Sequence, residues 1–213
     1  EYLIAASIMA APGAMAIAKI VYPETEESET KGTVTLKVAK EHTNLIDAIS
    51  AGCSDGLKVG LNVLAMLVGF LALIAFLNFG LGKIGGLVGF PTLSFDLILG
   101  YLFAGFAWCM GVPAAEIVQA GSLMGTKLAA NEFVAYLNLS PMIKAGTLSP
   151  KTIAIVSFAL CGFANFGSLG IQVGGISALE PSRRADLTKL AFRALICGTL
   201  ASYMSATLAG LLY

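Results

Sequence analysis

The chain has 213 residues, of which 57% are hydrophobic and only 12% are charged, whereas soluble domains carry roughly a quarter charged residues. This composition excludes an ordinary soluble protein. Thirteen basic and thirteen acidic residues cancel, so no net charge indicates nucleic acid or an acidic substrate as a partner. The four cysteines are far apart, in or beside apolar segments, and predict neither a disulfide framework nor a metal cluster.

Windows without charged residues give the organisation of the chain. They are 2–18, 59–82, 97–115, 152–179 and 194–213. All except 97–115 predict membrane-spanning helices, and the first is short and is expected to be kinked by Pro12. The chain starts without methionine and without the basic region of a signal peptide, so we expect a fragment that begins inside a larger protein.

Two helices are predicted to lie along the membrane surface. After a polar loop, residues 43–56 carry apolar side chains on one helical face, which is typical of an interfacial helix. The window 97–115 is interrupted by glycine and proline and contains Tyr101 and Trp108, residue types that favour the membrane interface. It is therefore predicted to lie along the interface as well.

The basic residues predict the orientation of the spans. If residues 19–58 and 180–193 are cytoplasmic, most lysines and arginines lie on that side, and only Lys83, Lys144 and Lys151 lie outside. This alternation requires residues 114–143 to enter and leave on the same face. That segment must be a re-entrant hairpin, or else lie outside the membrane.

The same segment contains Lys127 and Glu132 among small and apolar residues. An ionised side chain at the centre of a membrane helix costs about 2.5 to 3.5 kcal/mol, so its presence indicates a site or a paired charge. The alternative interpretation is that Lys127 and Glu132 form an internal pair in a surface helix.

Asn165 lies in the middle of an uncharged stretch, with Gly162 and Gly167 on either side. Burying an unpaired amide costs on the order of 1 to 3 kcal/mol, and glycine lets the chain leave helical dihedrals. We therefore predict a break in the helix near residues 163–167, of the kind that builds substrate sites in transporters. Alternatively, Asn165 forms a hydrogen bond between helices, and the spacing of Gly170 and Gly174 permits close helix packing.

Three stretches carry a resemblance to a known family. They are "KLAANEFVAYL" at 127–137, "CGFANFGSLGIQVGGI" at 161–176 and "AKIVYPETEE" at 18–27. The sequence resembles the concentrative nucleoside transporters, especially the bacterial ones, through essentially its whole length. It matches about the C-terminal half of that family's fold.

The resemblance implies an all-α polytopic membrane protein, one half of an inverted-repeat transporter fold. The implied elements are a transmembrane helix at 2–21, an interfacial helix at 43–56, a scaffold transmembrane helix at 57–84, an interfacial helix at 94–111, a re-entrant hairpin at 114–143, a broken transmembrane helix at 149–179 and a last transmembrane helix at 185–213.

The resemblance also implies a substrate site. The family holds the ribose of a nucleoside with an acidic residue of its NEF motif and polar residues of its FANxxS segment, which match Glu132, Asn165 and Ser168 here. Phe163 is the implied apolar contact. A carboxylate accepts hydrogen bonds from sugar hydroxyls, and an asparagine side chain both donates and accepts. Gly167 stands where many relatives carry serine, which removes one possible hydroxyl contact.

The nucleobase and a sodium ion are implied to bind in the other half of the family's fold, which this sequence does not contain. No cofactor or metal ion is therefore expected in this chain. The resemblance implies a homotrimer in the inner (plasma) membrane that imports nucleosides with sodium, or alternatively protons, by an elevator-like motion. The nucleobase preference is not predicted.

Other membrane functions remain as alternatives. A channel or structural membrane subunit would use Glu132 and Asn165 to line a path, and it would conduct without saturation. An intramembrane enzyme is poorly supplied with catalytic groups, because the one histidine, His42, lies in the polar loop and Glu132 has no second acid at membrane depth.

Overall fold

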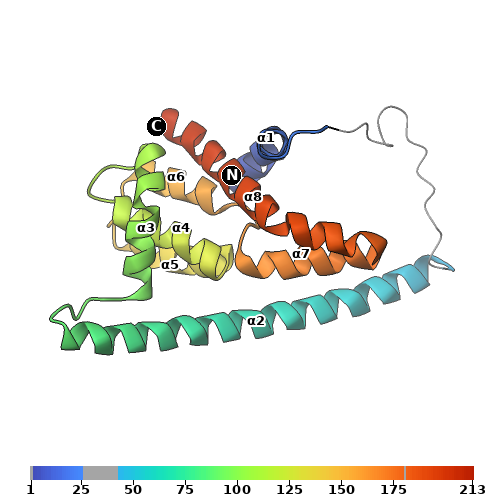
Figure 1. Ribbon diagram of the computed structural model, residues 1–213, viewed down its shortest axis with the longest axis horizontal. Coiled ribbons are helices and arrows are strands. Elements are labelled where there is room, and N and C mark those ends of the chain that lie inside the picture. The colour runs from blue at the N-terminus through green and yellow to red at the C-terminus, as the bar shows by residue number, and fades with distance from the viewer. Residues whose placement is uncertain (1, 26–42, 180) are drawn as a thin grey trace. The chain divides into compact units, whose positions relative to one another are not determined.

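The computed structural model describes residues 2–25, 43–179 and 181–213, and in these ranges it contains helices and no strand (Figure 1). The helices are α1 (Tyr2–Val21), α2 (Leu45–Leu87), α3 (Phe95–Cys109), α4 (Ile117–Ala129), α5 (Glu132–Lys144), α6 (Pro150–Leu160), α7 (Phe166–Leu179), the short 3-10 helix η1 (Pro181–Arg183) and α8 (Arg184–Leu211). The prediction of an all-α fold is confirmed.

Two helices of the described ranges are long and apolar enough to cross a membrane. They are Tyr2–Val21, with a mean hydropathy of 1.8, and Pro181–Leu211, with a mean hydropathy of 1.5. Shorter apolar helices occur at Leu71–Leu87, Phe95–Cys109 and Pro150–Leu160. The predicted polar loop falls largely on residues 26–42, outside the described residues.

The structure differs from the sequence prediction in α2. Separate helices were predicted at 43–56 and 57–84, but the helix runs without interruption from Leu45 to Leu87. The prediction placed a boundary where the side chains change from mixed to apolar. Such a change alters the surroundings that the side chains favour, but it does not interrupt backbone hydrogen bonding, which requires a proline or a capping residue.

The start of α2 is defined by side-chain caps. The Asp47 N–H donates to Asn44 Oδ1 at 2.9 Å, and Asp47 Oδ2 accepts from the N–H and the hydroxyl of Thr43, both at 3.0 Å. These bonds satisfy backbone donors that have no partner inside the helix. The bonds from Thr43 also lower the pKa of the exposed Asp47 carboxyl.

The chain divides into two compact units, Glu24–Leu73 and a larger unit of Glu1–Pro23 with Ile74–Tyr213. The core of the larger unit is apolar and is built mainly on α3 to α6 and α8. Asn78, near the end of α2, belongs to this unit. Its Oδ1 accepts from the Phe95 N–H at 2.7 Å, and its Nδ2 donates to Asp96 at 3.1 Å. Asp96 in turn accepts from Thr126 of α4 at 3.3 Å.

Helices α3 and α4 are in backbone contact through glycines. A Cβ atom on Gly121 would overlap the carbonyl oxygen of Gly100, and one on Gly125 would lie 2.5 Å from Leu99 Cβ. The GxxxG spacing that brings two helices together is therefore Gly121–Gly125, which the sequence prediction did not use. At the predicted pair, Gly170 and Gly174, no described atom lies within 4 Å of an added Cβ.

Replacing Gly121 tests this packing. In the full-length protein, Gly121→Ala is expected to lower stability by about 1 to 3 kcal/mol, because the methyl group forces the two backbones apart. Thermal unfolding in detergent measures the change. Gly105→Ala on the exposed surface of α3 is the matched control, since no described atom of another element lies within 4 Å of its added Cβ. Equal midpoints for the two variants would contradict the close contact.

Candidate functional site

The long apolar stretch at 152–179 is broken between α6 and α7. α6 ends at Leu160, α7 begins at Phe166, and residues 161–165 are not helical (Figure 1). The break was predicted at 163–167, so its position needs a correction toward the N-terminus. Its end is set by Asn165, which caps α7 and lets the helix start at the next residue.

Asn165 and Ser168 form a reciprocal cap at the start of α7. The Ser168 N–H donates to Asn165 Oδ1 at 2.8 Å, and the Asn165 N–H donates to Ser168 Oγ at 3.1 Å. The Ser168 hydroxyl also donates to the Asn165 carbonyl oxygen at 2.6 Å. This is the capping-box arrangement, with asparagine and serine in its two positions. It satisfies donors that the break would otherwise leave without partners.

A helical hairpin brings an acidic side chain to this cap. α4 and α5 are joined by Ala130 and Asn131, and Asn131 Oδ1 accepts from the Val134 N–H at 2.9 Å, which starts α5. Glu132 is the first residue of α5. A carboxylate at that position is favoured by the partial positive charge of a helix N-terminus.

The hairpin and the broken helix meet through Glu132 and Asn165. Asn165 Nδ2 donates to Glu132 Oε2 at 3.1 Å. Asn165 and Ser168 are each only 2% exposed, and Glu132 is half-buried. Within the described residues, Glu132 Oε1 accepts no hydrogen bond, so the carboxylate keeps acceptor capacity for a hydroxyl-bearing ligand.

Hydrogen bonds therefore bring together three of the four predicted site residues, Glu132, Asn165 and Ser168. The fourth, Phe163, forms no hydrogen bond with them. Phe163, inside the break, leaves 51% of its surface exposed, and Phe166, at the start of α7, leaves 50% exposed. Two exposed aromatic rings thus flank Asn165 in the sequence. They provide apolar surface beside a polar pair.

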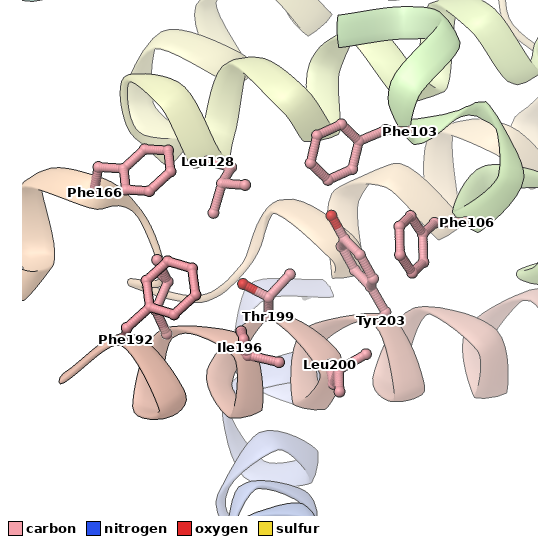
Figure 2. Close-up of a pocket in the computed structure, with 10 residues that line it drawn as sticks. Phe103, Phe106, Leu128, Phe166, Phe192, Ile196, Thr199, Leu200 and Tyr203 are labelled. Carbon is pink, nitrogen blue, oxygen red and sulfur yellow. The ribbon is translucent and has the colours of Figure 1, made fainter. Parts of the chain in front are cut away.

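An apolar cavity of about 230 Å³ adjoins the site at Phe166. It lies between α3, α4, α7 and α8, and Figure 2 shows the aromatic rings that surround it. Its lining residues are Phe103, Phe106, Leu128, Phe166, Phe192, Leu195, Ile196, Thr199, Leu200 and Tyr203. Thr199 Oγ1 and the Tyr203 hydroxyl are buried without a hydrogen-bond partner among the described residues.

Sequence reasoning missed the partner of Lys127. The alternative of an internal pair with Glu132 is wrong, because no ion pair joins these two residues, both of which the structure describes. Lys127 Nζ donates instead to the Ala159 carbonyl oxygen at 2.8 Å. Tyr136 was not singled out either, and its hydroxyl donates to the Ser157 carbonyl oxygen at 2.8 Å. Because every residue has a backbone carbonyl, the residue types in the sequence do not indicate which carbonyl accepts these bonds.

The arrangement matches a known family. Residues 2–210 match the family model described as "Na+ dependent nucleoside transporter C-terminus". The chain belongs to this nucleoside transporter family. The resemblance found in the sequence is thereby confirmed, and the family consists of transporters and not of enzymes.

Relatives of this nucleoside transporter chain support the membership. It is 48% identical over 99% of its length to the putative nucleoside permease NupX of Escherichia coli, covering 51% of that protein. It is 41% identical over 99% of its length to the sodium/nucleoside cotransporter 1 of Mus musculus, covering 35% of that protein. The chain thus spans about half the length of the bacterial relative.

Solved structures share the fold of this transporter chain. CNTnw in an inward-facing substrate-bound state superposes with a TM-score of 0.88 at 47% identity, over 99% of this chain and 49% of that one. A double variant of CNTnw in an outward-facing state gives a TM-score of 0.90 at 45% identity, over 99% of this chain and 50% of that one. At these identities the likeness covers sequence and fold together, and it identifies an integral membrane protein.

The cap of α7 yields a stability prediction. In the full-length protein, Ser168→Ala removes the bond that the Ser168 hydroxyl accepts from the Asn165 N–H and is expected to cost about 1 kcal/mol of stability. Thermal unfolding with and without substrate measures it. The matched control is Ser177→Ala in the same helix, because among the described residues the Ser177 hydroxyl bonds only to the Val173 carbonyl oxygen one turn earlier. A Ser168→Ala variant as stable as the control would contradict the cap.

Proposed function

We propose that this chain is the C-terminal half of a membrane importer that couples nucleoside uptake to a cation gradient. The observation that carries the proposal is the contact between Glu132 and Asn165, which joins the hairpin to the break between α6 and α7. Membership of a nucleoside transporter family supports nucleosides as the substrate. A polar pair at the break of an apolar helix suits a sugar with several hydroxyl groups.

The sugar is assigned to Glu132 and Asn165. The free oxygen of Glu132 accepts a hydrogen bond from one sugar hydroxyl, and the second hydrogen of Asn165 Nδ2 is available to donate to another. Asn165 Oδ1 is held by the cap of α7, so Nδ2 is the end of the amide that faces the ligand. The pair therefore selects a substrate that carries both a hydroxyl donor and an oxygen acceptor.

Ser168 and Phe163 complete the proposed site. The Ser168 hydroxyl is bonded to Asn165, so a contact with the sugar would replace the bond that this hydroxyl donates to the Asn165 carbonyl oxygen. The exposed ring of Phe163 supplies an apolar surface beside the sugar. Aromatic rings bury a large area with little loss of side-chain entropy, which suits a contact that is made and released in each cycle.

The nucleobase and the coupling cation are assigned to parts of the transporter outside these 213 residues. We favour sodium over protons, because the family description names Na+. Sodium is transported with the substrate and is not a resident cofactor of this chain. The base preference depends on residues that this sequence does not contain.

The transport cycle is proposed to be an elevator-like exchange of the site between the two sides of the membrane. The hairpin α4–α5 and the broken helix α6–α7 would move together, past α2 as the scaffold. Inward-facing and outward-facing states are described for CNTnw, which supports two stable arrangements in this family. The proposal includes a homotrimer in the plasma membrane, with residues 19–58 and 180–193 cytoplasmic.

Uptake of labelled uridine into liposomes that contain the full-length protein tests this proposal. We expect saturable uptake that depends on an inward sodium gradient. Uptake driven by a proton gradient instead would retain the nucleoside site and change the coupling. Flux that does not saturate would indicate a channel, and no uptake of any nucleoside by folded protein would contradict nucleoside transport.

The acidic residue of the site gives a sharper prediction. In the full-length protein, Glu132→Ala is expected to reduce saturable uridine uptake at least about tenfold, the effect of losing one or two hydrogen bonds to a charged group. The protein should still elute as one folded species. Asp186→Ala is the control, since within the described part of the chain Asp186 pairs only with exposed Arg183 on the surface and such pairs contribute little. Wild-type uptake by Glu132→Ala would overturn the assignment.

A further inference from the structure

A buried lysine of the hairpin plays no part in the proposed sugar contacts. Lys127 lies in the last turn of α4, is only 1% exposed, and is the largest of the fully buried side chains. An ammonium group is strongly disfavoured in an apolar interior unless it is well paired. The partner of this group therefore indicates what the lysine holds in place.

That partner is the end of α6. Lys127 Nζ donates to the carbonyl oxygen of Ala159 at 2.8 Å, within the last turn of the helix. Carbonyl groups of a last turn lack donors inside the helix and carry the partial negative charge of the helix dipole. The positive charge of Lys127 thus compensates the C-terminus of α6, and it does so at the point where the long helix breaks.

Helices α4 and α6 run parallel and in register. Where they begin, Glu116 Oε2 accepts from the N–H and the hydroxyl of Ser149, both at 3.0 Å. Where they end, Lys127 bonds to Ala159. Because the two contacts join equivalent ends, the tip of the hairpin lies at the same level as the break.

The hairpin holds the chain on both sides of that break. Before the break, Lys127 bonds to Ala159, and after the break, Glu132 bonds to Asn165. Tyr136 of α5 adds a second bond on the α6 side through Ser157. The residues between these points are thus bonded at both ends to the same hairpin.

Inside the break, the chain passes between Lys127 and α8. A Cβ atom added to Gly162 would lie 3.5 Å from Lys127 Nζ and would overlap the hydroxyl of Ser202. That hydroxyl donates to the Cys161 carbonyl oxygen at 3.4 Å. Only a glycine fits this path without displacing the Ser202 side chain, so the break packs closely against α8 and lies beside Lys127.

We infer that Lys127 is a positioning residue for the sugar-binding pair of the proposed transporter. It does not touch the sugar. By holding the end of α6 against the hairpin, it sets where Asn165 meets Glu132, so that both side chains contact the sugar hydroxyls at the same time. Tyr136 is a second donor from the hairpin to the end of α6, through the Ser157 carbonyl oxygen. This inference rests on the proposed function.

Binding to the full-length protein by calorimetry tests the inference with two probes, uridine and 3′-deoxyuridine. The wild type is expected to prefer uridine, because the deoxy analogue leaves a polar group of the site unpaired. Lys127→Met is expected to weaken uridine binding about tenfold, the effect of one charge-assisted hydrogen bond. Binding of 3′-deoxyuridine should change much less, so the preference for uridine shrinks.

The ratio of the affinities for uridine and 3′-deoxyuridine distinguishes a positioning role of Lys127 from a general loss of folding. Partial unfolding would weaken the binding of both nucleosides to the same extent. Lys127→Arg, which keeps the charge and the donors, is expected to restore most of the preference. Lys144→Met, the same change at an exposed lysine of α5, should behave as wild type. A folded Lys127→Met protein with the wild-type ratio would overturn the inference.

Tyr136→Phe provides the second variant if Lys127→Met does not fold. It removes one hydroxyl and keeps the ring, and it is expected to reduce the uridine preference in the same direction. An unchanged preference in Tyr136→Phe would then overturn the inference. Failure of the wild type to bind any nucleoside would contradict the proposed function itself, whereas wild-type binding with an unchanged ratio in the variants contradicts only the role of Lys127.

Discussion

The structure depends on satisfying the backbone groups that are freed where the helix at 150–179 breaks. A helix end buried in apolar surroundings leaves N–H and C=O groups that water cannot reach. Here the start of α7 is satisfied by Asn165 and Ser168, and the end of α6 receives donors from Lys127 and Tyr136. The break is therefore a specified conformation and not a weak point in a helix.

The two charged residues of the hairpin follow from the same constraint. Glu132 lies at the start of α5 and bonds to the residue that caps α7, where helix dipoles are positive. Lys127 of α4 donates to the end of α6, where the helix dipole is negative. Each charge is bonded to a group at a helix end, and no salt bridge joins these two described residues to each other. The carboxylate of Glu132 is consequently free to take a ligand as a second partner.

Much of this arrangement can be predicted from the sequence, because it is encoded in residue types. An acid and an amide within apolar segments indicated Glu132 and Asn165, and the balance of basic residues indicated a hairpin at 114–143. The partner of Lys127 could not be predicted, since a backbone carbonyl can belong to any residue. The residue at which the break ends can be predicted from the sequence, because Asn165 and Ser168 have the spacing of a capping box. The continuity of α2 was missed because hydropathy was used to place a boundary in the backbone.

A structure of the full-length protein with bound uridine tests the central claim most directly. The claim is that the hairpin and the broken helix together form the sugar half of a nucleoside site. It predicts sugar hydroxyl oxygens within hydrogen-bond distance of Glu132 and Asn165, and a nucleobase held by residues outside these 213. A uridine bound elsewhere, with the Glu132–Asn165 bond unchanged and no ligand beside it, would contradict the claim.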